Sequence, residues 1–314
     1  MAYAEGSRRN LNTQWESFLL FCTYFKFCPL PADTETLQLY AQFLSRSFKS
    51  VESIKNYISG VKIMHLLLGA KIEHINNFLL NLSLKGMSKT KLHMVRQAHP
   101  MTTNLLLKIY RVLDLSSPDD NTFWCLFLFA FFLLARKSNL VPTTKKELLN
   151  PKFLLSKDVR VTSTGLLITM KWTKTIQKGE RLLVVPLTCI NGSPLCPVKA
   201  YHRMIGYIPR SMSCPLFILN SGKPVFYNTY LKKLRSVIEM IGLDPSHFST
   251  HSFRRGMATL AFQLNLPADI IQLLGDWKSD AYKKYLYFSL TDKLRLSKYI
   301  SDKIQSEGYE HGNL

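Results

Sequence analysis

The amino-acid sequence predicts a mainly α-helical protein with a small β-sheet, organised as a helical N-terminal domain followed by an α+β domain. Apolar residues recur at helical spacing over most of the 314-residue chain. Only the region 166–187 combines β-branched apolar runs with a polar turn that contains glycine. A chain of this length corresponds to about two domains of ordinary size.

The N-terminal domain is predicted to span residues 1–87. Its four candidate helices are 11–27, 36–48, 53–68 and 74–84. Asp33 is a candidate cap for the second helix, and Gly69 and Gly86 are expected to end the third and the fourth. Four short helices in a row indicate a small helical bundle.

Residues 88–100 lose the helical periodicity and are predicted to link the two domains. The stretch is polar and basic, and Lys89, Lys91 and Arg96 are its candidate DNA-binding residues. A basic linker is suited to lie along a phosphate backbone.

The second domain is predicted to span residues 101–314. Two helices, 103–113 and 122–136, precede a β-hairpin whose strands are 166–172 and 181–187. Helical patterns then return at 196–205, 227–241, 253–264, 268–274 and 281–304. The most apolar run, 123–135, is shorter than the roughly 20 residues that cross a bilayer, so it is expected to be a buried helix and no membrane association is expected.

The charge of the chain indicates an anionic partner. Lys and Arg number 41 against 21 Asp and Glu, which gives a net charge of +20. A positive field of this size most often serves nucleic acid, although an acidic membrane or an ordinary basic protein would also fit.

The cysteines predict neither disulfides nor a metal site. There are six, without paired CxxC spacing, and Cys189, Cys196 and His202 match no standard zinc arrangement. Residues 1–10 are polar and show no signal peptide. We expect reduced thiols and a location in the nucleus of a eukaryote, or otherwise in the cytoplasm.

Two isolated cations are candidates for a phosphate site. Arg136 directly follows the most apolar segment, where it is either aimed at an anion or placed at the surface by the helix dipole. Lys174 lies in the turn of the hairpin, where it is either a flexible proton donor or a solvated turn residue.

Two later stretches carry further candidate residues. His251 and Arg254 are three residues apart at the start of a predicted helix, so they share one face near free backbone N–H groups. Trp277 and Tyr285 lie in a segment of tyrosines and lysines. Each stretch also has an ordinary structural interpretation as a satisfied histidine or an amphipathic surface.

Taken in order, these residues resemble the catalytic signature of the tyrosine recombinase (phage integrase) family. The matching set is Arg136, Lys174, His251, Arg254, Trp277 and Tyr285. Residues 53–62 are similar to the characteristic helix of the family's core-binding domain, which implies DNA contacts for Lys55 and Lys62. Residues 275–285 are most similar to recombinases of eukaryotic mobile elements of the DIRS and Crypton kind.

The resemblance implies cleavage and rejoining of double-stranded DNA through a 3′-phosphotyrosyl intermediate, with no metal or other cofactor. It makes Tyr285 the nucleophile and the two arginines the phosphate clamp. His251 would accept the tyrosine proton, Lys174 would protonate the leaving 5′ oxygen, and Trp277 would donate its indole N–H. Strand exchange implies a homo-oligomer, a tetramer on DNA, and integration or excision of a mobile element.

Two departures from the family pattern leave alternatives open. Asn139 stands where many members carry an acidic residue, and Trp277 and Tyr285 are eight residues apart, one fewer than is common in bacterial members. Tyr282 and Tyr287 lie close to Tyr285, and Tyr282 is expected to be a packing residue. The alternatives are an inactive element-derived DNA-binding protein, a type IB topoisomerase and, least favoured, an RNA-binding protein.

Overall fold

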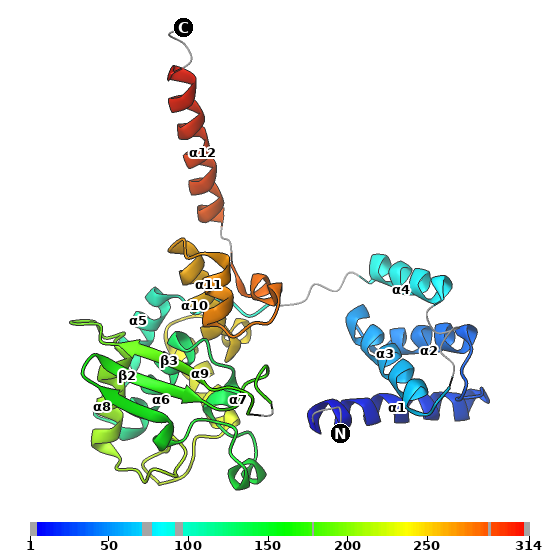
Figure 1. Cartoon of the computed structure of the whole chain (residues 1–314), viewed down its shortest axis with the longest axis horizontal. Helices are drawn as coiled ribbons and strands as arrows, with labels where there is room; N and C mark the ends of the chain where they lie inside the picture. The colour runs from blue at the N-terminus through cyan, green and yellow to red at the C-terminus, as the bar shows by residue number, and fades with distance from the viewer. Residues whose placement is uncertain (1–4, 71–76, 92–96, 178, 288–289, 311–314) are drawn as a thin grey trace. The chain divides into compact units, whose positions relative to one another are not determined.

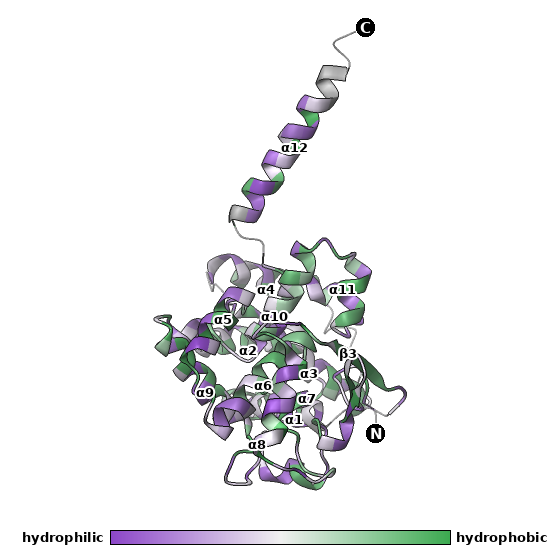
Figure 2. Ribbon diagram, turned by 90° about the vertical axis from the view of Figure 1, so that its left-hand side faces the viewer, coloured by the Kyte–Doolittle hydropathy of each residue, from purple (hydrophilic) through white to green (hydrophobic). Residues whose placement is uncertain are grey.

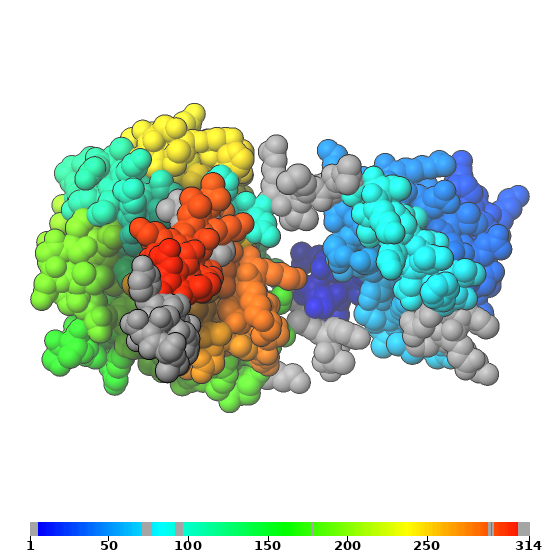
Figure 3. Space-filling view, turned by 90° about the horizontal axis from the view of Figure 1, so that it is seen from above, coloured from blue at the N-terminus to red at the C-terminus, as the bar shows by residue number. Residues whose placement is uncertain are grey.

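The computed structural model describes residues 5–70, 77–91, 97–177, 179–287 and 290–310. The chain divides into two compact units, Met1–Arg96 and Gln97–Leu314. Figure 1 and the space-filling view of Figure 3 distinguish them by colour, with the first unit blue to cyan and the second green to red.

The first unit consists of four helices. They are α1 (Glu5–Phe25), α2 (Thr34–Ser47), α3 (Val51–Leu67) and α4 (Phe78–Thr90). Phe18, Leu37, Tyr40 and Ile54 are fully buried between α1, α2 and α3. Asp33 caps α2 as predicted, since its side chain accepts a hydrogen bond from the Thr36 N–H.

Helix α4 differs from its predicted bounds. The expected start at residue 74 lies outside the described residues, and the helix continues through Gly86 to Thr90. Leu80 and Leu84 are buried in the core and Met87 packs against it, which outweighs the roughly 1 kcal/mol cost of a glycine inside a helix. The first residues of the predicted linker are therefore helical.

The second unit is built around one buried helix, α6 (Pro118–Phe132). This helix begins after a Ser117 cap and buries every residue from 121 to 131, as the sequence predicts. The other helices of this unit are α5 (Thr103–Val112), α7 (Lys137–Leu140), α8 (Pro197–Tyr207), α9 (Tyr227–Met240), α10 (His251–Gln263), α11 (Ala268–Leu274) and α12 (Leu290–Glu310). Short 3₁₀ turns are η1 (Lys145–Leu149), η2 (Ser156–Asp158), η3 (Pro245–His247) and η4 (Asp280–Tyr285).

A three-stranded antiparallel sheet packs against these helices. Its order is β1 (Val159–Thr162), β2 (Gly165–Met170) and β3 (Leu183–Thr188), and β2 and β3 are the two arms of the predicted hairpin. Strand β1 has only four residues, too few for a recognisable alternation, and the sequence did not reveal it. The mainly helical architecture with a small sheet is as predicted (Figure 1).

Two predicted helix ends are wrong. The helix expected over 122–136 ends at Phe132, because Leu134 adopts a left-handed backbone with φ of 45°. The single helix expected over 281–304 is instead a 3₁₀ turn, η4, followed by a break and then α12. At the break, the Tyr287 N–H donates to Thr259 Oγ1 at 3.1 Å rather than to a carbonyl one turn earlier.

Helix α12 is amphipathic and exposed. Leu294, Tyr299 and Ile304 are 62%, 60% and 64% exposed, and Figure 2 shows hydrophobic and hydrophilic residues interspersed along it. Among the described residues, no helix combines the length and the apolar character needed to span a membrane.

Candidate active site

The N-terminus of α10 places the predicted H-x-x-R pair. Phe253 is fully buried in the main core, and Gly256 lies so close to Met101 that a Cβ would be 1.8 Å from its carbonyl oxygen. With this face of α10 fixed against the core, the Arg254 side chain lies against the rings of Trp277 and Tyr285 and is 2% exposed. His251, one turn earlier, keeps access to solvent although its ring is partly buried.

Arg254 joins three separate segments of the chain. Its guanidinium donates to the Leu134 carbonyl and, at 2.6 Å, to the Gly275 carbonyl. The left-handed turn at Leu134 makes the first of these acceptors available. Burial and the charge of Arg136 lower the Arg254 pKa to about 10, so it remains charged at neutral pH.

The rings of Trp277 and Tyr285 lie against this guanidinium. The Arg254 Cζ is 4.0 Å from the Trp277 ring centroid and 5.2 Å from that of Tyr285. The two rings are 5.2 Å apart. Gly275 is required beneath Trp277, because a Cβ there would lie 1.6 Å from the indole ring.

The three neighbouring tyrosines have different environments. Tyr285 is half-buried beside Trp277 at the end of η4. Tyr282 is only 6% exposed and packs in the cluster with Ile271 and Trp277, as a packing residue would. Tyr287 is 46% exposed.

Arg136 and His251 complete a convergence of positive charge. Arg136 is half-buried and is the N-cap residue of α7, the short helix that follows the C-terminus of α6. Partial burial lowers the pKa of His251, and the charges of Arg254, Arg136 and Lys137 lower it further. His251 is therefore held neutral, able to accept a proton.

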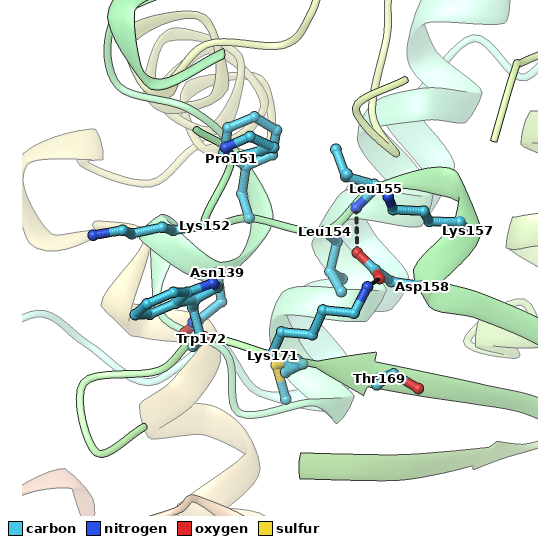
Figure 4. Close-up of a pocket in the computed structure, with 12 residues that line it drawn as sticks. Asn139, Pro151, Lys152, Leu154, Leu155, Lys157, Asp158, Thr169, Lys171 and Trp172 are labelled. Carbon is cyan, nitrogen blue, oxygen red and sulfur yellow. Dashed lines mark hydrogen bonds and ion pairs between the residues drawn. The ribbon is translucent and has the colours of Figure 1, made fainter. Parts of the chain in front are cut away.

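Asn139 connects Arg136 to the hairpin. Its side-chain oxygen accepts from the Arg136 backbone N–H at 3.1 Å, and its amide donates to the Trp172 carbonyl at 2.7 Å. Figure 4 shows Asn139 and Trp172 together in a pocket, with Lys152 nearby. The Lys152 ammonium lies 4.9 Å from the Trp172 ring centroid. An acidic side chain at position 139 could not donate to that carbonyl.

Replacing Asn139 with Asp is therefore expected to destabilise the protein. Asn139 is 6% exposed, so the Trp172 carbonyl would lose its donor in a buried setting and face a carboxylate oxygen. We expect the free energy of unfolding to fall by about 1–3 kcal/mol. Urea denaturation measures it, with Asn150→Asp at an exposed position as control. An Asn139→Asp variant as stable as the parent would contradict this role.

Lys174 is exposed in the turn between β2 and β3. Its neighbours Thr173 and Thr175 both donate hydrogen bonds to the carboxylate of Asp276, the residue before Trp277. The structure thus brings the Lys174 turn to the segment that carries Trp277. Four of the six predicted residues, Arg136, His251, Trp277 and Tyr285, gather around the guanidinium of a fifth, Arg254. The turn that contains the sixth, Lys174, is hydrogen-bonded to Asp276, next to Trp277.

The architecture that carries this cluster is found in solved recombinases. A lambda integrase dimer bound to a COC′ core site has a TM-score of 0.60 at 14% identity, over 90% of this chain and 89% of that one. A Tn1549 transposon integrase in complex with transposon right end DNA gives 0.56 at 13% identity, over 86% of each chain. The XerH site-specific recombinase bound to palindromic difH gives 0.55 at 16%, over 86% of this chain and 69% of that one.

The chain has the fold of the tyrosine recombinases. At these identities the likeness extends to the fold alone. No protein-family model and no curated protein matches the chain.

Within the tyrosine recombinase fold, the predicted DNA-binding cations lie in the first unit. Lys55 pairs with Glu52 at 2.9 Å, Lys62 is half-buried, and Lys89 is exposed. Lys91 donates to the carbonyls of Ser45 and Phe48, so its ammonium caps the C-terminus of α2. Arg96 lies outside the described residues.

Sequence reasoning missed two charged residues of the site. Arg255 donates to the Lys284 carbonyl at 2.8 Å and to Gln97 Oε1 at 2.9 Å, which fixes the segment that ends in Tyr285. Asp276 accepts hydrogen bonds from Thr173 and Thr175 in the hairpin turn. Both adjoin residues of the family signature, but only the folded contacts distinguish them from surface charges. In the described part of the chain, no cluster of three metal-ligating side chains occurs.

Proposed function

We propose that this chain cleaves and rejoins double-stranded DNA as a tyrosine recombinase, through a 3′-phosphotyrosyl intermediate at Tyr285. The observation that carries the proposal is a pair of unused donors beside Tyr285. Within the described residues, Trp277 Nε1 and Arg254 Nε are buried and have no hydrogen-bond partner. A buried donor without a partner costs about 1–3 kcal/mol, and a phosphate oxygen would satisfy both.

The positive charge around Tyr285 suits the transition state of phosphoryl transfer. In-line attack on a phosphodiester builds negative charge on the equatorial oxygens, which preorganised cations stabilise. Arg136 and Arg254 supply that charge, because each guanidinium is positive and offers several donors.

Proton transfer accompanies each bond change. Tyr285 Oη bonds to phosphorus and gives its proton to His251, which is neutral. The bond from phosphorus to the 5′ oxygen breaks, and Lys174 protonates that oxygen. A 5′-hydroxyl of another strand then attacks the phosphotyrosine and restores Tyr285, so the linkage is conserved without an energy-rich cofactor.

Strand exchange between two duplexes needs several protomers, and we propose a homo-tetramer on DNA. The exposed apolar side chains of α12, among them Leu294 and Tyr299, support docking of this helix on a neighbouring protomer. The basic first unit, including Lys55, Lys62 and Lys89, would contact the phosphate backbone, and the net charge of +20 supports this. We further propose integration or excision of a mobile element, in the nucleus of its host.

Trapping the covalent intermediate tests the proposal. The protein is incubated with a library of nicked duplexes of randomised sequence, in which the cleaved end diffuses away and rejoining cannot occur. Adducts that survive SDS are isolated, and their DNA is sequenced. We expect an SDS-stable adduct enriched in one sequence.

The alternatives give other results with the same protein. DNA binding without any adduct would contradict recombinase activity and favour an inactive DNA-binding protein. Relaxation of supercoiled plasmid without exchange of strands between duplexes would favour a topoisomerase instead.

The pH dependence of cleavage should report the lowered pKa of His251. Because the neutral ring accepts the proton, the cleavage rate falls as pH drops through this pKa, which lies below the ordinary 6.5. At pH 6.5 more than half of the ring is neutral, so single-turnover cleavage should retain more than half of its plateau rate. His251→Gln should lose this acidic limb, whereas His202→Gln on α8 should keep it. A limb centred above pH 6.5 would contradict the assignment.

A further inference from the structure

The turn that carries Lys174 is held by a single carboxylate. Thr173 Oγ1 donates to Asp276 Oδ2 at 2.6 Å, and Thr175 Oγ1 donates to the same oxygen. Arg181, on the β3 side of the hairpin, forms an ion pair with Oδ1. The Asp276 side chain is 8% exposed. Both of its oxygens therefore serve the hairpin, on either side of Lys174.

The backbone of the turn is closed around Thr173. Thr173 Oγ1 accepts from the N–H groups of Thr175 and Ile176, each at 3.1 Å. The Thr173 N–H donates to the Ile176 carbonyl at 3.1 Å, and Ile176 is fully buried. Lys174 thus extends from a fixed backbone, and its own side chain is exposed.

Asp276 also belongs to the segment that faces Tyr285. It lies between Gly275, whose carbonyl accepts from Arg254, and Trp277, whose ring packs against that guanidinium. Its backbone is left-handed, with φ of 52°, a conformation that Asp, Asn and Gly adopt more readily than other residues. The Asp276 carboxylate thus connects the turn that contains Lys174 to the segment that contains Gly275 and Trp277.

We propose that Asp276 is a positioning residue that places Lys174 for protonation of the leaving 5′ oxygen. The inference rests on the proposed function. As the bond from Tyr285 Oη to phosphorus forms, the bond from phosphorus to the 5′ oxygen breaks and its electron pair passes to that oxygen. Lys174 Nζ supplies the proton, and Asp276 acts only through the turn that holds Lys174.

A substrate with sulfur in place of the bridging 5′ oxygen tests this. A thiolate leaves without a proton donor, so the phosphorothiolate removes the need for Lys174 but not for the phosphate clamp or the nucleophile. Asp276→Gly removes the carboxylate at a position whose backbone suits glycine. With the oxygen substrate we expect Asp276→Gly and Lys174→Ala to cleave about 10²-fold more slowly than the parent, since general acids contribute about 10²–10⁴-fold.

With the sulfur substrate both variants should come within about threefold of the parent, because the proton donor is no longer needed. Thr175→Val removes one donor to Asp276 and should slow cleavage of the oxygen substrate less than Asp276→Gly does, with the same rescue by sulfur. Asp276→Asn should also slow cleavage of the oxygen substrate only partly. Asp120→Asn is the control, since that carboxylate pairs with Lys233 and the Asp114 N–H. It should cleave both substrates like the parent.

Each contrary outcome has a distinct meaning. If sulfur rescues Lys174→Ala but not Asp276→Gly, Asp276 serves Trp277 or the fold, and the inference is wrong. If Asp276→Gly cleaves the oxygen substrate at the parental rate, the inference is also wrong. If the parent itself forms no adduct with either substrate, the proposed function fails first.

Discussion

Tyr285→Phe is expected to abolish the covalent protein–DNA adduct while leaving the fold and DNA binding intact. The variant loses only the hydroxyl, and its ring keeps the contacts with Trp277 and Arg254, both 5.2 Å away between centres. Loss of a covalent nucleophile lowers the rate by on the order of 10⁴-fold or more. SDS gel analysis of nicked duplexes measures the adduct, and a gel-shift assay measures binding.

The neighbouring tyrosines provide matched controls. Tyr282→Phe removes a hydroxyl from a packing residue and Tyr287→Phe removes one from an exposed residue, so both should form the adduct at near-parental rates. An adduct that persists in Tyr285→Phe and disappears in Tyr282→Phe would move the nucleophile to Tyr282.

Arg254→Lys is expected to cause the second largest loss. Lysine keeps the positive charge, but it cannot bond the carbonyls of Leu134 and Gly275 and also supply a donor equivalent to the buried, unpartnered Nε. Removing one preorganised donor from a transition state costs about 10²–10³-fold in rate. Single-turnover cleavage at saturating protein measures this, and DNA affinity should change little.

Two controls accompany Arg254→Lys, one for its folding and one for the substitution of arginine by lysine in general. Circular dichroism shows whether Arg254→Lys is folded, and Arg160→Lys repeats the substitution at an exposed position on β1. A folded Arg254→Lys variant that cleaves at the parental rate would show that the guanidinium does not contact the reacting phosphate.

The sequence predicted the elements whose pattern is local. The apolar helix α6 and the hairpin of β2 and β3 follow from composition and alternation alone. The break between η4 and α12 could not be predicted, because it depends on Thr259, 28 residues away, which accepts the Tyr287 N–H. Helical periodicity on both sides of the break concealed it.

The same division applies to the candidate site. Arg254 and Tyr285 were found from an ordered motif, whereas Asp276 and Arg255 are recognisable only by what they contact. Asp276 binds residues about 100 positions earlier in the chain, at sequence separations of 103 and 101. Lys91, predicted from its charge as a DNA-binding residue, also donates to the Ser45 and Phe48 carbonyls, contacts more than 40 residues away that its charge alone does not reveal.

Locating the DNA linkage within the protein tests the central claim most directly. Adducts are digested with nuclease and trypsin, and the modified peptide is sequenced by mass spectrometry. Trypsin separates Tyr282, in 279–283, from Tyr285, in 285–293, and fragmentation distinguishes Tyr285 from Tyr287. We predict a nucleotide joined through its 3′ phosphate to Tyr285. A 5′ linkage, a linkage to any other residue, or no linked peptide from sequence-selected DNA would contradict the account.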